Sequence, residues 1–176
     1  MRLYASSDCN QLANAVPAAL ATGGQILVSV WTEDDKHFNA EKQALLQAVQ
    51  TWEFGWIVAA CDWVRMDGYP YYQGMYANGI ENSFDLFWGS VYQVRDVVNR
   101  VHPGVWVWVT ETVWPSAGAS VNAAVPSVQN ARMYWSQTIC SSFAHRHTFV
   151  YSLQDGGNLP FGVVGANFNP AYNPAC

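Results

Sequence analysis

One run of residues, from Val105 to Pro115, constrains the fold of this chain more than any other. Residues 105–109 alternate valine with tryptophan, which predicts a β-strand whose two faces are both apolar, and Pro115 stops the run. Strands of this kind are typical of parallel sheets covered by helices. Glu111 comes where the strand ends, and α/β folds place their chemistry at the carboxyl ends of such strands.

Strand-like and helix-like segments alternate along the rest of the chain. Further strand signals occur at 2–6, 26–31, 56–66 and 148–153, and helical spacing occurs at 10–22, 39–52, 83–101 and 127–144. Gly23 and Gly24 supply a C-cap signal for the first helix, and the tail at 158–176 predicts a loop. Alternation of this kind implies right-handed βαβ units. The sequence therefore predicts an α/β fold, an incomplete (β/α) TIM-type barrel with about five parallel strands where a complete barrel needs eight.

Composition excludes several classes of partner. Only 12% of the 176 residues are charged, the formal net charge is -5 and the chain has no basic run, which argues against nucleic acid and against anionic membranes. Aromatic residues make up 15% of the chain. Many aromatic rings with few charges are typical of sites for neutral, hydroxyl-rich ligands. The sequence also shows no signal peptide and no transmembrane stretch.

The cysteines indicate an oxidising compartment. Their number is even, and four cysteines permit three pairings that the sequence leaves open: Cys9, Cys61, Cys140 and Cys176. No C-x-x-C spacing and no His-rich cluster is present, so the sequence predicts neither a metal site nor a cofactor.

Five segments together resemble glycoside hydrolase family 17, the β-1,3-glucanases and β-1,3-glucanosyltransferases, and in particular its fungal cell-wall members. They are R-L-Y-A-S-S-D-C from Arg2, V-S-V-W-T-E-D-D from Val28, C-D-W-V-R-M-D-G-Y-P-Y from Cys61, W-V-T-E-T-V-W-P from Trp108 and F-V-Y-S-L-Q-D from Phe149. The resemblance implies a secreted or cell-wall protein that acts on β-1,3-glucan or a related oligosaccharide.

The resemblance also implies roles for individual residues. Glu111 stands where the family has its catalytic nucleophile, while Val113 stands where the family has Gly, which permits a positive φ and close backbone approach. The expected substrate-binding positions combine family matches with carboxylates at strand ends: Tyr4, Glu33, Asp67, Tyr69, Trp114 and Asp155.

The family's barrel, laid over the single domain 1–176, shows what is absent. The first strand and the stretch from the fourth strand through the fifth have no counterpart, with a junction near 59–61. The missing stretch carries the family's general acid/base Glu, whereas retaining glycosidases need two carboxylates about 5–5.5 Å apart.

Two functions therefore stay open. The chain is a β-1,3-glucan hydrolase or transferase in which another carboxylate replaces the lost acid, with Glu33, Asp34, Asp35, Asp67 and Asp155 as candidates. Alternatively, it is a catalytically inactive relative that binds glucan, or a truncated product. Open sheet edges would favour self-association in either case.

Overall fold

The computed structural model describes residues 3, 5–24, 26, 28, 35–52, 63–155, 160–165 and 167–176. The chain divides into two compact units, Met1–Cys61 and Asp62–Cys176. Of the predicted strands at 2–6 and 26–31, the structure describes only residues 3, 5, 6, 26 and 28, none of which forms a strand, and the junction near 59–61 lies outside the described residues. So do Tyr4, Glu33 and Cys61.

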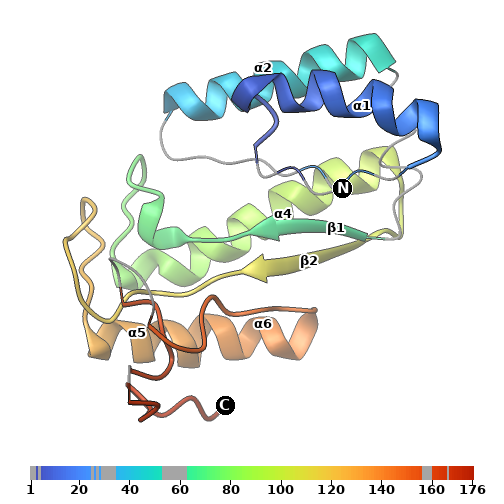
Figure 1. Ribbon diagram of the computed structural model, residues 1–176. Coiled ribbons are helices and arrows are strands. Elements are labelled where there is room, and N and C mark those ends of the chain that lie inside the picture. Colours follow the sequence, from blue (N-terminus) through green and yellow to red (C-terminus); the bar gives the residue numbers. More distant parts are fainter. Residues whose placement is uncertain are drawn as a thin grey trace. The chain divides into compact units, whose positions relative to one another are not determined.

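In the described part of the first unit, two helices run side by side (Figure 1). A short 3-10 turn, η1 (Asp8–Asn10), leads into α1 (Gln11–Thr22), and α2 (Asp35–Trp52) follows. Gly23 ends α1 in the left-handed conformation with φ 65°, so the helix predicted at 10–22 and its C-cap are confirmed. The second helix begins at Asp35, four residues before its predicted start. The helices meet through a small apolar core: Leu3, Leu12, Ala15, Val16 and Ala48.

A buried carboxylate orders the chain that leads into α1. Glu41 lies on α2 and its side chain is fully buried. It accepts hydrogen bonds from the backbone N–H groups of Ser6, at 2.7 Å, and Ser7, at 2.8 Å. A buried carboxylate is costly unless it is hydrogen-bonded, so the two N–H donors stabilise Glu41 in its buried position. In return, Glu41 holds the backbone of Ser6 and Ser7 in place.

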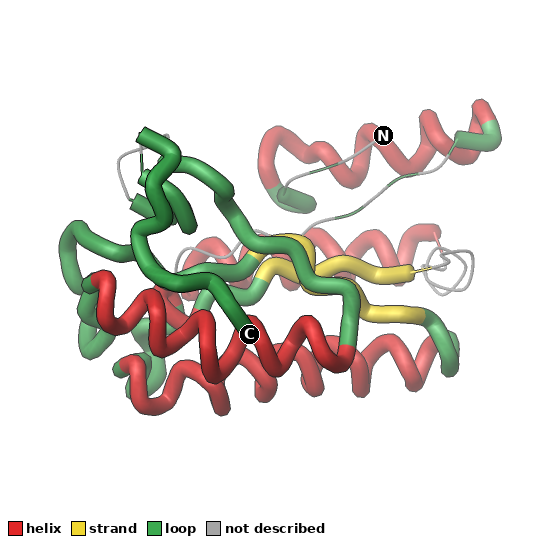
Figure 2. Tube along the Cα trace, turned by 90° about the horizontal axis from the view of Figure 1, so that it is seen from below, coloured by secondary structure: helices red, strands yellow, loops and turns green. Residues whose placement is uncertain are grey.

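The second unit is built on one βαβ element. Strands β1 (Trp63–Asp67) and β2 (Trp106–Glu111) are parallel neighbours, and α4 (Ser83–Val101) connects them. Two 3-10 turns, η2 (Pro70–Tyr72) and η3 (Ile80–Asn82), lie between β1 and α4. The helix α4 runs along one face of the strand pair (Figures 1 and 2). Its bounds are those predicted, and its Phe87, Trp88 and Val91 form one core cluster with Val109 of β2.

Burial of β2 is confirmed for one of its two apolar faces. Val107 and Val109 are buried, with 4% and 0% of their surface exposed, whereas Trp106 is 61% exposed. Trp108 on that second face stacks on Trp63 of β1, with ring centroids 4.4 Å apart.

The helix predicted at 127–144 is also confirmed, in three consecutive segments. They are α5 (Val128–Tyr134), the π-helical turn η4 (Trp135–Ile139) and α6 (Cys140–His145). Ser127 caps the start, because its hydroxyl accepts a hydrogen bond from the Asn130 N–H at 3.0 Å. Within the described part of the chain, no helix is long and apolar enough to cross a bilayer.

The segment predicted as a strand at 148–153 forms only one parallel bridge to β2, at Thr148. Beyond that bridge its backbone pairs with the tail instead: Ser152 donates to Phe161, and Val164 donates to Leu153 at 2.9 Å. The sheet in the described residues therefore has two strands and this bridge, fewer than the five predicted.

The C-terminal tail is a loop, as predicted, and a disulfide fastens it. Of the three pairings left open by the sequence, the structure contains Cys140–Cys176, which ties the start of α6 to the last residue. Cys9 is exposed and is not part of a disulfide.

Candidate functional site at the carboxyl ends of β1 and β2

A β-bulge sets the direction of Glu111. Met66 pairs with Val109, but the next pair is Asp67 with Glu111, so Thr110 is left without a partner in the strand register. A bulge bends its strand and redirects the side chains that follow. The displaced Thr110 hydroxyl donates to the Asp67 carboxylate at 2.7 Å, and the Gly68 N–H donates to the Glu111 carbonyl at 2.8 Å. These bonds fix the end of β2 to the end of β1.

The half-buried Glu111 side chain accepts a hydrogen bond from Tyr69. The phenol donates to Glu111 Oε2 at 3.0 Å. Burial raises the pKa of Tyr69 far above its ordinary value of 10, and the negative charge of Glu111 and this hydrogen bond raise it further. Tyr69 therefore stays protonated at any ordinary pH and serves as a permanent donor to the carboxylate.

Aromatic rings surround that tyrosine. Tyr69 packs against Tyr72 and Phe161, with ring centroids 5.9 and 6.1 Å away. Tyr72 is 43% exposed, so a ring reaches solvent close to the carboxylate. A carboxylate beside exposed aromatic surface suits a pyranose, whose C–H faces pack on rings while its hydroxyls bind polar groups.

Two of the candidate substitute acids already accept hydrogen bonds. Asp67 accepts from the Arg65 guanidinium at 3.3 Å and from the Thr110 hydroxyl at 2.7 Å. Asp155 accepts from the Gly162 N–H at 2.6 Å. Burial and, secondarily, the charge of Asp155 raise the pKa of Tyr172 to about 12. Contacts thus bring together Asp67, Tyr69 and Glu111, while Asp155 contacts the tail.

Trp114, which the sequence predicts as a substrate-binding residue, is buried. Its side chain is only 1% exposed, and its indole N–H donates to the Val125 carbonyl at 3.1 Å. The ring packs against Tyr71 and Tyr134 in the largest core cluster. The chain turns inward directly after Glu111, and residues 112–115 are all buried.

Val113 fits its position without the freedom of a glycine. Its side chain is 1% exposed, and its φ is not positive. The left-handed backbone that Gly would permit is therefore not used here, and the valine contributes to the core instead.

Sequence reasoning missed two members of this site. The bulge at Thr110 has no signal in a run that reads as regular strand, and Phe161 lies in a tail that predicts only loop. Asp35, another candidate acid, begins α2 in the first unit. Among the residues that the structure describes, no group of His, Cys, Asp and Glu could hold a metal ion.

Comparison with known proteins identifies the family. Residues 53–169 match the profile of the glycosyl hydrolases family 17. The chain belongs to this family. The match includes β1, α4, β2 and the contact between Tyr69 and Glu111.

Two curated relatives are fungal. The probable glucan endo-1,3-beta-glucosidase eglC of Aspergillus fumigatus is 38% identical over an alignment of 126 residues that covers 68% of this chain and 27% of that protein. The glucan 1,3-beta-glucosidase of Saccharomyces cerevisiae is 26% identical over 207 residues, covering 80% of this chain and 65% of that protein. The chain thus spans about a quarter of the length of the Aspergillus relative.

A solved structure shares the fold. A Rhizomucor miehei beta-1,3-glucanosyltransferase, an active-site mutant in complex with laminaritriose, superposes with a TM-score of 0.54 at 22% identity. The match covers 96% of this chain and 82% of the other. It indicates a fold of the (β/α)-barrel type.

Proposed function

We propose that this chain acts on β-1,3-glucan through Glu111 as the nucleophile of a retaining glycosidase site. The observation that carries the proposal is the Glu111 carboxylate at the carboxyl end of β2, held by the Tyr69 hydroxyl at 3.0 Å. The named activities of the Aspergillus and yeast relatives and the laminaritriose bound by the Rhizomucor protein support the choice of substrate.

The first chemical step follows from the carboxylate and its donor. An oxygen of Glu111 attacks the anomeric carbon and forms a C–O bond, while the glycosidic C–O bond breaks and its electron pair leaves with the departing oxygen. Water then cleaves the glycosyl-enzyme for hydrolysis, or a sugar hydroxyl cleaves it for transfer. Tyr69 holds one carboxylate oxygen, which fixes the direction from which the other attacks.

The leaving oxygen also needs a proton. General acid catalysis typically contributes about 10²–10⁴-fold, and Asp67 and Asp155 are both engaged as hydrogen-bond acceptors. This observation favours a second candidate function, glucan binding with little turnover. The alignment with the yeast protein supports a missing stretch. It extends over 207 residues, more than the 176 of this chain, although it includes only 80% of this chain, so part of the yeast protein has no counterpart here.

The proposed place of action is outside the cell, where the family's cell-wall substrate is found. The Cys140–Cys176 disulfide supports an oxidising environment.

An activated substrate tests the proposed nucleophile independently of the missing acid. A 2,4-dinitrophenyl β-laminaribioside releases its phenolate without protonation, so Glu111 alone is sufficient for the first step. We expect a burst of phenolate equal to the protein concentration, a laminaribiosyl mass on the peptide that contains Glu111, and faster turnover when azide replaces water as the acceptor.

The variants and the natural substrate decide between the two functions. Glu111→Gln should abolish the burst, whereas Glu81→Gln, on the exposed η3 turn, should preserve it. Release of reducing ends from a soluble β-1,3-glucan in addition to the burst would show that another carboxylate supplies the acid. A burst without that release leaves glucan binding as the native function. No burst from a folded sample would refute the role of Glu111.

A further inference from the structure

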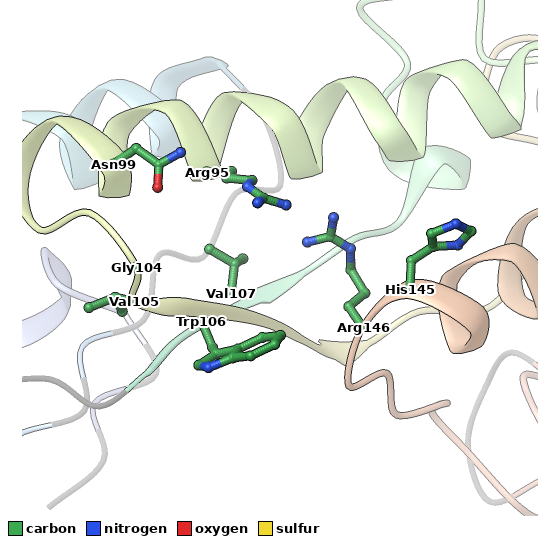
Figure 3. A pocket seen from close by; sticks show the side chains of 8 residues that line it. All are labelled: Arg95, Asn99, Gly104, Val105, Trp106, Val107, His145 and Arg146. Atoms are coloured by element: carbon green, nitrogen blue, oxygen red, sulfur yellow. The ribbon is translucent and has the colours of Figure 1, made fainter.

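A small basic pocket lies at the opposite end of β2 from Glu111. It has a volume of about 200 Å³ and is formed by the last turns of α4, the start of β2 and the end of α6 (Figure 3). With about 3.3 Å per residue in a parallel strand, the two ends of β2 are about 17 Å apart. The pocket is therefore separate from the proposed glycosidase site.

Two guanidinium groups face each other across this pocket. Figure 3 shows the side chains of Arg95, from α4, and Arg146, which follows α6, pointing toward one another, with the Asn99 amide beside them. Burial lowers the pKa of Arg146, and the positive charge of Arg95 lowers it further. Within the described part of the chain, neither arginine forms an ion pair with a carboxylate. Two like charges thus converge without a counter-charge.

Arg146 is held in place by neutral groups. Its guanidinium lies over the Trp88 ring, 5.0 Å from the ring centroid, and Trp88 is itself buried. Its Nε atom is buried and has no hydrogen-bond partner. Buried polar atoms in native structures nearly always have a partner, so this donor indicates a group that is not part of the chain.

We propose that this pocket binds a tetrahedral oxyanion of the phosphate class, either free or as the phosphoryl group of a small molecule. Arginine forks bind such oxygens with paired N–H donors, and an anion between Arg95 and Arg146 removes their mutual repulsion. The Asn99 amide adds another donor at the rim. Glucan is uncharged and gains nothing from two guanidiniums, and the pocket is smaller than the roughly 300–1,000 Å³ of sites for larger ligands.

The test uses the whole chain and inorganic phosphate as the probe. Phosphate is titrated at constant ionic strength, with chloride as the balancing anion, while calorimetry measures binding and NMR follows the Arg146 Nε–H signal. We expect saturable binding and a shift of that signal. Phenyl phosphate forms a second arm: tighter binding than phosphate assigns the site to a phosphoryl ester, and weaker binding assigns it to the free ion.

Variants connect the binding to the two arginines. Arg146→Lys keeps the charge but loses the paired donors, and Arg95→Gln removes the second charge, so each should weaken phosphate binding about tenfold or more. Arg95 is exposed, so its variant remains informative if Arg146→Lys fails to fold. Arg100→Gln, an exposed position on the same helix outside the pocket, should change the affinity less than twofold. No saturable binding at constant ionic strength, or an equal loss in Arg100→Gln, would overturn the proposal.

Discussion

The disulfide between Cys140 and Cys176 fastens the C-terminal tail, and its energetic contribution can be calculated from the chain. The two cysteines are 36 residues apart. In the chain-entropy account, closing a loop of that length stabilises the folded state by about 4 kcal/mol at 25 °C, because it restricts the unfolded chain. The tail also has native contacts of its own: Tyr172 packs against Trp135, whose indole N–H donates to the Pro174 carbonyl at 2.8 Å. We therefore expect the Cys140→Ser/Cys176→Ser double variant to keep the tail docked and to lose about 4 kcal/mol of unfolding free energy.

Urea denaturation without reductant, followed by tryptophan fluorescence, measures this loss. For a slope of about 2 kcal/mol per molar urea, the midpoint should fall by about 2 M. Hydrogen exchange of the Trp135 indole N–H under native conditions should stay slow if the tail remains docked. Cys9→Ser, at an exposed free thiol, is the control and should change stability by less than about 0.5 kcal/mol. A midpoint within 0.5 M of the parent, or rapid exchange of the Trp135 indole, would refute the argument from the unfolded chain.

Four further predictions follow from single contacts. Tyr69→Phe removes the donor to Glu111, so the burst rate with the activated glucoside should fall about 10–100-fold; an unchanged rate would contradict its role. Val113→Gly removes a buried side chain and should lower the unfolding free energy by about 2–4 kcal/mol in urea, whereas unchanged stability would show that the site prefers glycine. Glu41→Ala leaves the Ser6 and Ser7 amides without their acceptor and should accelerate their hydrogen exchange about tenfold or more; unaltered exchange would contradict it. The Tyr172 pKa is raised from 10 to about 12, so its contribution to stability is complete below pH 10 and is lost between pH 10 and 12, by up to about 1.4 kcal/mol per pH unit. The unfolding free energy should therefore fall less steeply with pH across that range in Tyr172→Phe than in the parent.

The helices could be predicted from the sequence because their apolar spacing and their caps are local. The helix at 83–101 was predicted to the residue, and α1 ends at the predicted Gly23. The segment at 148–153 has the composition of a strand, yet its backbone pairs mostly with residues 161–164 rather than with β2. The pairing partner of a strand-like segment is determined by residues far away in the sequence. The composition of the segment itself therefore does not predict that partner.

The site shows the same division between local and distant information. Glu111 at the end of β2 followed from the strand pattern, and Tyr69 followed from the family resemblance. The burial of Trp114 did not follow from the sequence, because Glu111 is half-buried while residues 112–115, directly after it, are buried. The sugar-binding roles of all six expected residues stay predictions: Tyr4, Glu33, Asp67, Tyr69, Trp114 and Asp155.

The nucleophile and the acid of a retaining site depend on different parts of the barrel. Within the described part of the chain, the Tyr69 hydroxyl, the Gly68 N–H and the strand pairing contact Glu111, and all three belong to β1, β2 or the residues that directly follow β1. This βαβ element carries its own core between α4 and β2. These contacts of the proposed nucleophile do not depend on the fourth strand of the family, whereas the acid that this strand carries does. An activated substrate should accordingly react with this chain even where glucan does not, since the first needs only Glu111 and the second needs both carboxylates.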